Sequence, residues 1–168
     1  MHDSTAGRVC SGNLLPVEDT PSILASILPS ILVLGAVAAA AFLLLRIRGR
    51  VASTAASRAL TIAVVFQAIH FAEEMATGFH KQFPELFEQP AMPQAFFVAF
   101  NLSWLIIWIA SIPGLTVGKP VASFAAWFLA LAGILNGIAH PVMAVVDDGY
   151  FPGLLSSPLV AIACLWLA

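Results

Sequence analysis

The chain has 168 residues, of which 60% are hydrophobic and only 10% are charged, and its formal net charge is −2 at pH 7. A soluble globular domain typically has about 25% charged residues, so this composition excludes an ordinary soluble domain and indicates an integral membrane protein. Because the net charge is slightly negative, we expect no nucleic-acid partner.

Five apolar runs predict the helices, at about 22–45, 59–79, 92–112, 121–146 and 154–168. The first four are long enough to cross a hydrocarbon core of about 30 Å. The last either spans the membrane or lies short in one leaflet, and we favour a fifth span. We therefore expect an all-α fold, a polytopic integral membrane bundle of about five transmembrane helices. It forms one domain at 22–168, after a polar extracytoplasmic segment at 1–21.

The basic residues predict the orientation of these helices. Five of the seven lie in or beside the first and third connections; they are Arg46, Arg48, Arg50, Arg58 and Lys119. Cytoplasmic connections carry an excess of Lys and Arg, so we place these two connections in the cytoplasm and the N-terminus outside. The first run has acidic residues before it and arginines after it, the reverse of a secretory signal, and is expected to remain as an anchor. We expect a multi-pass protein of the plasma membrane.

Strongly polar side chains interrupt the second, third and fourth runs. They are His70, Glu73, Glu74, Asn101, Asn136 and His140. Counted along each helix from its outer end, they lie roughly 7–16 Å deep, in one layer of the outer half of the membrane. A charged residue near the bilayer centre costs about 2.5–3.5 kcal/mol on insertion scales, which argues for a function. We predict that these side chains meet in one cavity.

Residue spacing sharpens this prediction. His70 precedes Glu73 by three residues and Glu74 by four, so both carboxylates can lie near the imidazole on one helix face. Asn136 and His140 have the same four-residue spacing. The second and fourth runs are therefore expected to contribute most of the cavity's polar groups.

Other residues are expected to shape this cavity. Gly133 and Gly137 form a pattern of small residues that lets the fourth run approach a neighbouring helix closely. Trp104 shares a helix face with Asn101 and is expected to line the cavity. The segment Tyr150-Phe151-Pro152-Gly153 predicts a turn that caps it.

Four features of the membrane region occur together: the segment His70-Phe71-Ala72-Glu73-Glu74, Asn101, the stretch 136–140 and Tyr150-Phe151-Pro152-Gly153. In this combination the chain, from about 59 to 158, resembles the HXXEE-domain family of small bacterial membrane proteins. That family has no established activity. The resemblance therefore implies a membrane protein with a polar centre inside the membrane and does not imply any particular chemistry.

The chemistry that we favour from the residues is general acid–base catalysis without a cofactor. Two adjacent carboxylates in a low-dielectric medium do not readily both ionise, so one is expected to be a proton donor and the other an acceptor. Since the cavity opens to lipid, we expect isomerisation or protonation-initiated cyclisation of a lipophilic, terpenoid- or polyketide-like substrate. The predicted catalytic residues are His70, Glu73, Glu74 and His140, and the predicted substrate-binding residues are Asn101, Asn136, Trp104 and Tyr150.

Two alternatives use the same polar residues. In the first, His70, Glu73, Glu74 and His140 bind zinc with an open water position, or non-haem iron, in a membrane hydrolase or oxidase. In the second, which is not enzymatic, the two histidines are axial haem ligands or the Glu pair relays protons or cations. The sequence does not choose between a metal and no metal.

Overall fold

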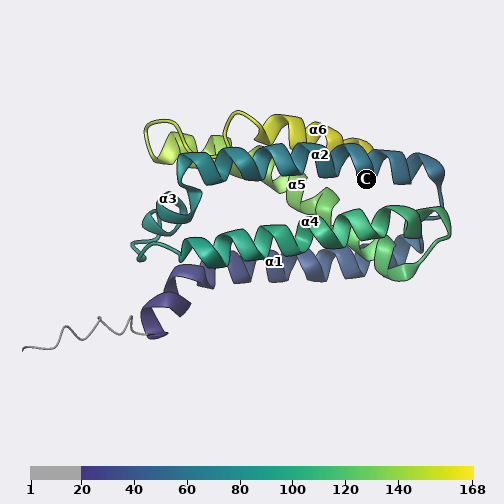
Figure 1. Ribbon diagram of the computed structural model, residues 1–168, viewed down its shortest axis with the longest axis horizontal. Helices are drawn as coiled ribbons and strands as arrows, with labels where there is room; N and C mark the ends of the chain where they lie inside the picture. The colour runs from purple at the N-terminus through teal and green to yellow at the C-terminus, as the bar shows by residue number, and fades with distance from the viewer. Residues whose placement is uncertain (1–19) are drawn as a thin grey trace, which may run out of the picture.

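The computed structural model describes residues 20–168, which contain six helices and no strand (Figure 1). The helices are α1 (Thr20–Arg48), α2 (Thr54–Thr77), α3 (Phe79–Glu85), α4 (Gln94–Thr116), α5 (Pro120–Val146) and α6 (Ser157–Leu167). This confirms the predicted all-α bundle. The polar segment predicted at 1–21 lies outside the described residues except for its last two positions, which begin α1.

Four of the described helices, α1, α2, α4 and α5, are long and apolar enough to cross a membrane. Large apolar side chains on their outer faces are exposed, for example Leu32 and Ile106. The chain is therefore a helical membrane protein. The expected fifth span is shorter than predicted, because the 11 residues of α6 rise only about 16 Å, roughly half of a hydrocarbon core. Residues 147–156, which we call the α5–α6 loop, fold back towards α2 before this helix begins.

The ends of α2 have local causes. Ser53 caps its start, since the Ser53 Oγ accepts hydrogen bonds from the N–H groups of Ala55 at 3.1 Å and Ala56 at 3.4 Å. The helix therefore begins before the predicted position 59. It ends at Gly78, whose φ of 88° is a left-handed conformation that glycine adopts without a steric penalty. The short helix α3, which follows directly, was not predicted.

The helices pack around α5, which contacts α1, α4 and α6, while α2 contacts α4 and α6. The glycine pattern has the predicted effect. A Cβ atom on Gly133 would collide with Cys164, and one on Gly137 would collide with Ala161. These two glycines therefore let α5 lie directly against α6, which in turn brings the α5–α6 loop close to α2.

The connections gather at the two ends of the bundle (Figure 1). At one end, the Val51 N–H donates to Ser123 Oγ at 2.9 Å and the Ser53 N–H donates to the Leu115 carbonyl at 3.1 Å. The predicted first and third connections therefore lie at the same end, as the orientation prediction requires. Helix α3 and the α5–α6 loop lie at the other end. Which end faces the cytoplasm stays a prediction.

Candidate metal centre

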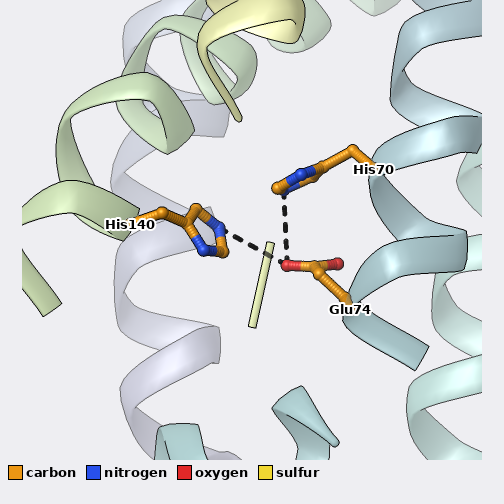
Figure 2. A group of neighbouring side chains, drawn as sticks. All are labelled: His70, Glu74 and His140. Carbon is orange, nitrogen blue, oxygen red and sulfur yellow. Dashed lines mark ion pairs between the residues drawn. The ribbon is translucent and has the colours of Figure 1, made fainter. Parts of the chain in front are cut away.

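Three buried side chains from α2 and α5 meet at the α3 end of the bundle (Figure 2). His70 and Glu74 lie one helical turn apart on α2, and His140 comes from α5. Their exposed fractions are 0% for His70, 6% for Glu74 and 2% for His140. The structure thus brings together three of the predicted site residues in a place closed to bulk water.

The metal-ligating atoms of these side chains point at one another. The Nε2 atom of His70 lies 3.4 Å from Oε1 of Glu74, and Nε2 of His140 lies 3.5 Å from the same oxygen. The two imidazole rings meet edge to face with their centroids 4.7 Å apart. One potential ligand atom from each residue lies within 4.8 Å of the other two. The group is compact enough for all three residues to share one ion.

The α5–α6 loop holds the far side of each imidazole. Nδ1 of His140 lies 2.6 Å from the Pro152 carbonyl oxygen. Because a carbonyl only accepts, Nδ1 carries the hydrogen, and when the ring is neutral its Nε2 presents a lone pair to Glu74. Nδ1 of His70 lies 2.8 Å from Ser156 Oγ, while its buried Nε2 has no hydrogen-bond partner among the described residues.

The backbone of Gly153 covers both rings. A Cβ atom at this position would lie 2.6 Å from Cε1 of His140 and 2.7 Å from Cε1 of His70. The φ of Gly153 is 87°, so glycine is favoured by conformation as well as by space. Phe151, which is fully buried, lies beside His140 with the ring centroids 5.9 Å apart. The predicted capping turn is thus formed by the loop that also bonds the histidines.

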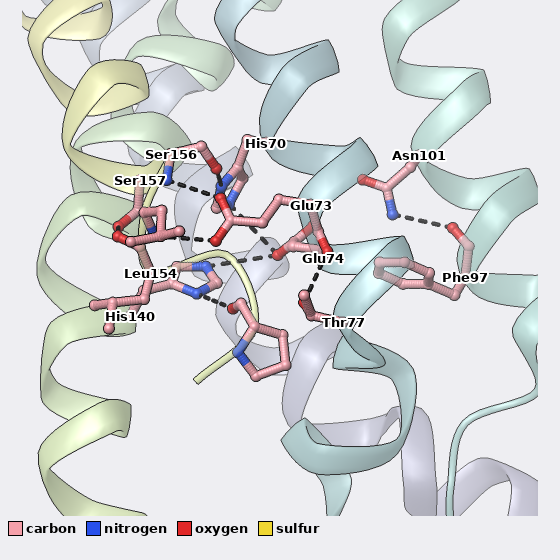
Figure 3. Close-up of polar contacts among 12 residues, drawn as sticks. His70, Glu73, Glu74, Thr77, Phe97, Asn101, His140, Leu154, Ser156 and Ser157 are labelled. Atoms are coloured by element: carbon pink, nitrogen blue, oxygen red, sulfur yellow. Dashed lines mark hydrogen bonds and ion pairs between the residues drawn. The ribbon is translucent and has the colours of Figure 1, made fainter. Parts of the chain in front are cut away.

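The Glu73 carboxylate bonds to the α5–α6 loop and not to this group, although Glu73 neighbours Glu74 in sequence (Figure 3). Its Oε1 accepts hydrogen bonds from the Tyr150 hydroxyl at 2.6 Å and the Leu155 N–H at 3.0 Å, and its Oε2 accepts one from the Ser156 N–H at 2.8 Å. Successive residues of a helix are about 100° apart around the axis, so the two carboxylates face different neighbours. The structure therefore places Glu73, predicted as a catalytic or ligating residue, on the α5–α6 loop. It likewise places Tyr150, predicted to bind substrate, on the Glu73 carboxylate.

Of the remaining predicted substrate-binding residues, Asn101 and Trp104 have partners outside the three buried side chains. The Asn101 amide donates to the Phe97 carbonyl of its own helix at 3.0 Å (Figure 3). Trp104 stacks on Phe128 in the apolar core, with ring centroids 4.2 Å apart. Asn136 is half-buried on α5, one turn before His140. Depth in the membrane was the basis of the prediction, and depth does not determine which way a side chain points around the helix axis.

Two partners of the histidines, the Pro152 carbonyl and the Ser156 hydroxyl, were not predicted. Both belong to the α5–α6 loop, more than ten residues from the nearest histidine in sequence, so no helical spacing rule relates them to the site. The one feature of the sequence that could have indicated these contacts is the Pro152-Gly153 pair. It indicates a turn but does not specify which side chains the turn covers.

A family model described as "Protein of unknown function with HXXEE motif" matches residues 60–167. The chain belongs to the HXXEE family. The motif corresponds here to His70, Glu73 and Glu74, which the structure divides between the buried group and the loop. No curated protein and no solved structure matches the chain. The chemistry of this HXXEE protein is therefore argued from the geometry of its site.

Proposed function

We propose that this HXXEE protein is a membrane metalloenzyme in which His70, Glu74 and His140 bind one zinc ion. The convergence of two imidazole nitrogens and one carboxylate oxygen carries the proposal. The His140 Nε2 atom, with the ring hydrogen on Nδ1, lies 3.5 Å from a carboxylate oxygen, and both atoms are acceptors. A buried arrangement of this kind needs a cation or a shared proton between the acceptors.

The separations between the ligand atoms are compatible with a cation among them. Hydrogen bonds between nitrogen and oxygen span about 2.7–3.2 Å, and the observed separations of 3.4 and 3.5 Å are longer. Two ligand atoms bonded to a tetrahedral zinc at about 2.0–2.1 Å are roughly 3.3–3.4 Å apart, close to the observed values. The same bond lengths at a right angle, as on one face of an octahedral iron site, would need roughly 2.9 Å. Because two histidines and one glutamate are also a common ligand set of catalytic zinc, we propose zinc as the ion.

The outer contacts also fit a metal site. A histidine that ligates a metal usually donates its other ring N–H to a carbonyl, a carboxylate or a water. His140 has such a bond to the Pro152 carbonyl, and Nδ1 of His70 contacts Ser156. Two histidines and one glutamate leave the fourth position of a tetrahedral zinc open, which is the arrangement of catalytic rather than structural sites.

We propose hydrolysis of a lipophilic substrate as the reaction. An ion held by His70, Glu74 and His140 would lower the pKa of a bound water, whose oxygen would add to a carbonyl carbon or a phosphorus atom. The bond to the leaving group would then break, and the proton of the water would end on that group. The centre lies within helices of membrane length, in the proposed plasma-membrane location. A substrate that arrives through lipid would therefore have an apolar chain beside the cleaved bond.

The other hypotheses fit the geometry less well. Metal-free acid–base catalysis by His70, Glu73, Glu74 and His140 on a terpenoid- or polyketide-like lipid stays a prediction. For haem, the rings of His70 and His140 would have to lie on opposite faces of a planar macrocycle. They instead meet edge to face, with both Nε2 atoms near one carboxylate oxygen.

Elemental analysis of the full chain purified in detergent tests the proposal. We expect about one zinc per chain, and loss of most of that zinc in His140→Ala and Glu74→Gln, because each variant removes one ligand. His80→Ala is the matched control, since His80 is buried in α3 and is not a member of the group. A metal-free wild-type protein that still turns over a lipid would refute the metalloenzyme and support acid–base catalysis.

A further inference from the structure

We infer that Glu73 is a positioning residue that fastens the α5–α6 loop over the metal centre and thereby fixes the orientation of both histidines. The inference rests on the proposed metal centre and deepens it. It assigns a role to the one motif residue that the centre itself does not use.

The first observation is the set of donors around the Glu73 carboxylate. One hydroxyl, from Tyr150, and two backbone N–H groups, from Leu155 and Ser156, donate to its two oxygens over 2.6–3.0 Å. Hydrogen bonds to an ionised carboxylate are roughly twice as strong as those between neutral groups. All three donors belong to the α5–α6 loop, so Glu73 holds this loop against α2.

The second observation is that the same loop supplies the outer partners of both histidines. The Pro152 carbonyl accepts from His140, and the Ser156 hydroxyl contacts His70. Ser156 makes both kinds of contact, because its N–H donates to Glu73 and its Oγ lies 2.8 Å from His70 Nδ1. A loop that moved away from Glu73 would therefore move the outer partners of both imidazoles.

The third observation is the close fit of the loop on the rings. The position that a Cβ of Gly153 would occupy lies less than 3 Å from both His70 and His140. A side chain at this position would collide with both rings, so glycine is what lets the loop backbone lie over them. The α5–α6 loop therefore fixes the orientation of the two imidazole rings, and Glu73 fixes the position of the loop.

Competition with a chromophoric chelator tests this inference through the zinc affinity of the full chain in detergent. Glu73→Gln preserves the size of the side chain but turns an NH₂ group towards backbone donors. We expect its zinc affinity to fall about 10–100-fold, as is usual when outer partners of a metal site are lost. Tyr150→Phe removes one of the three donors and should cause a smaller loss. Glu85→Gln is the matched control, because Glu85 is exposed in α3, and it should bind zinc as the wild type does.

Two further measurements separate positioning from simple stabilisation of the fold. If Glu73 positions the rings, the visible spectrum of bound Co²⁺ should change in Glu73→Gln, whereas a purely structural role would lower only the melting temperature. Hydrogen exchange at the Leu155 and Ser156 amides should accelerate in the same variant, and this readout needs no metal.

The outcomes distinguish the two proposals. A wild-type chain that binds no zinc overturns the metalloenzyme, and the exchange rates alone then show whether Glu73 fastens the loop. A Glu73→Gln variant with wild-type zinc affinity and an unchanged Co²⁺ spectrum overturns the inference and leaves the metal centre standing. If Glu73→Gln does not fold, Tyr150→Phe decides: weaker zinc binding supports the inference, and wild-type binding overturns it.

Discussion

Glu73 and Glu74 differ in what surrounds them rather than in their chemistry. Glu74 is 6% exposed and faces two imidazoles, while Glu73 is half-buried and faces the donors of the α5–α6 loop. A buried carboxylate without a partner would cost several kcal/mol. The two carboxylates of the motif therefore have different surroundings. Glu74 faces two imidazoles, where we propose that a cation binds, and Glu73 accepts hydrogen bonds from neutral donors.

Tyr150 provides a direct probe of the Glu73 carboxylate, because it is the single tyrosine of the chain. The pKa of its hydroxyl is raised above the ordinary value. Burial is the largest cause, and the hydrogen bond to Glu73 is the next largest. Since the folded pKa is raised, the contribution of this contact to stability is fully present below the ordinary tyrosine pKa of about 10. It is lost only as the pH rises through the raised value.

We expect an absorbance titration of tyrosinate in the folded chain to give a midpoint above about 10. In Glu73→Ala the midpoint should fall towards that value, because the negatively charged acceptor is gone. Glu85→Ala serves as the control and should leave the midpoint in place. An unchanged midpoint in Glu73→Ala would show that the Tyr150–Glu73 bond does not form.

At the scale of elements, the α5–α6 loop determines the site as much as the helices do. Helices α2 and α5 bring the buried side chains of His70, Glu74 and His140 together, and the α5–α6 loop contacts the Nδ1 atom of each imidazole. The glycine contacts between α5 and α6 bring the two helices that flank this loop close together. The loop therefore connects the packing of the bundle to the geometry of the site.

The loop should tolerate a methyl group at one glycine and not at another. Gly153→Ala places a Cβ 2.6 Å from His140 and imposes a left-handed φ on alanine, so we expect zinc binding at least 10-fold weaker and a lower melting temperature. Gly149→Ala is the control in the same loop, since its Cβ would meet its nearest neighbour, the Asp147 carbonyl oxygen, at 3.8 Å. Equal zinc affinities in the two variants would contradict the close fit over the histidines.

At the scale of the whole molecule, the predictable features were those set by hydropathy and charge. Apolar length located four membrane-length helices, and the basic residues identified two connections that do lie at one end. Features that depend on rotation about a helix axis or on loop contacts were not predictable from spacing alone. Asn101 bonds within α4, Trp104 packs in the core, and Ser156 reaches His70 from a distant part of the chain.

The sidedness of the bundle is testable on the intact membrane. With the two native cysteines replaced, single cysteines near Arg48 should react with a membrane-impermeant reagent only from the cytoplasmic side, and those near Glu85 only from outside. Detergent-opened membranes serve as the control for accessibility. The reverse labelling pattern would invert the orientation and place the metal centre in the cytoplasmic half of the membrane.

X-ray absorption at the zinc edge tests the metal centre most directly, because it counts and identifies the atoms bound to the ion. For the wild-type chain we expect four nitrogen and oxygen neighbours at about 2.0–2.1 Å, two of them imidazoles, and in His140→Ala we expect little bound zinc to remain. Absence of stoichiometric zinc, or a shell with sulfur or six light atoms, would contradict a tetrahedral site built from His70, Glu74 and His140.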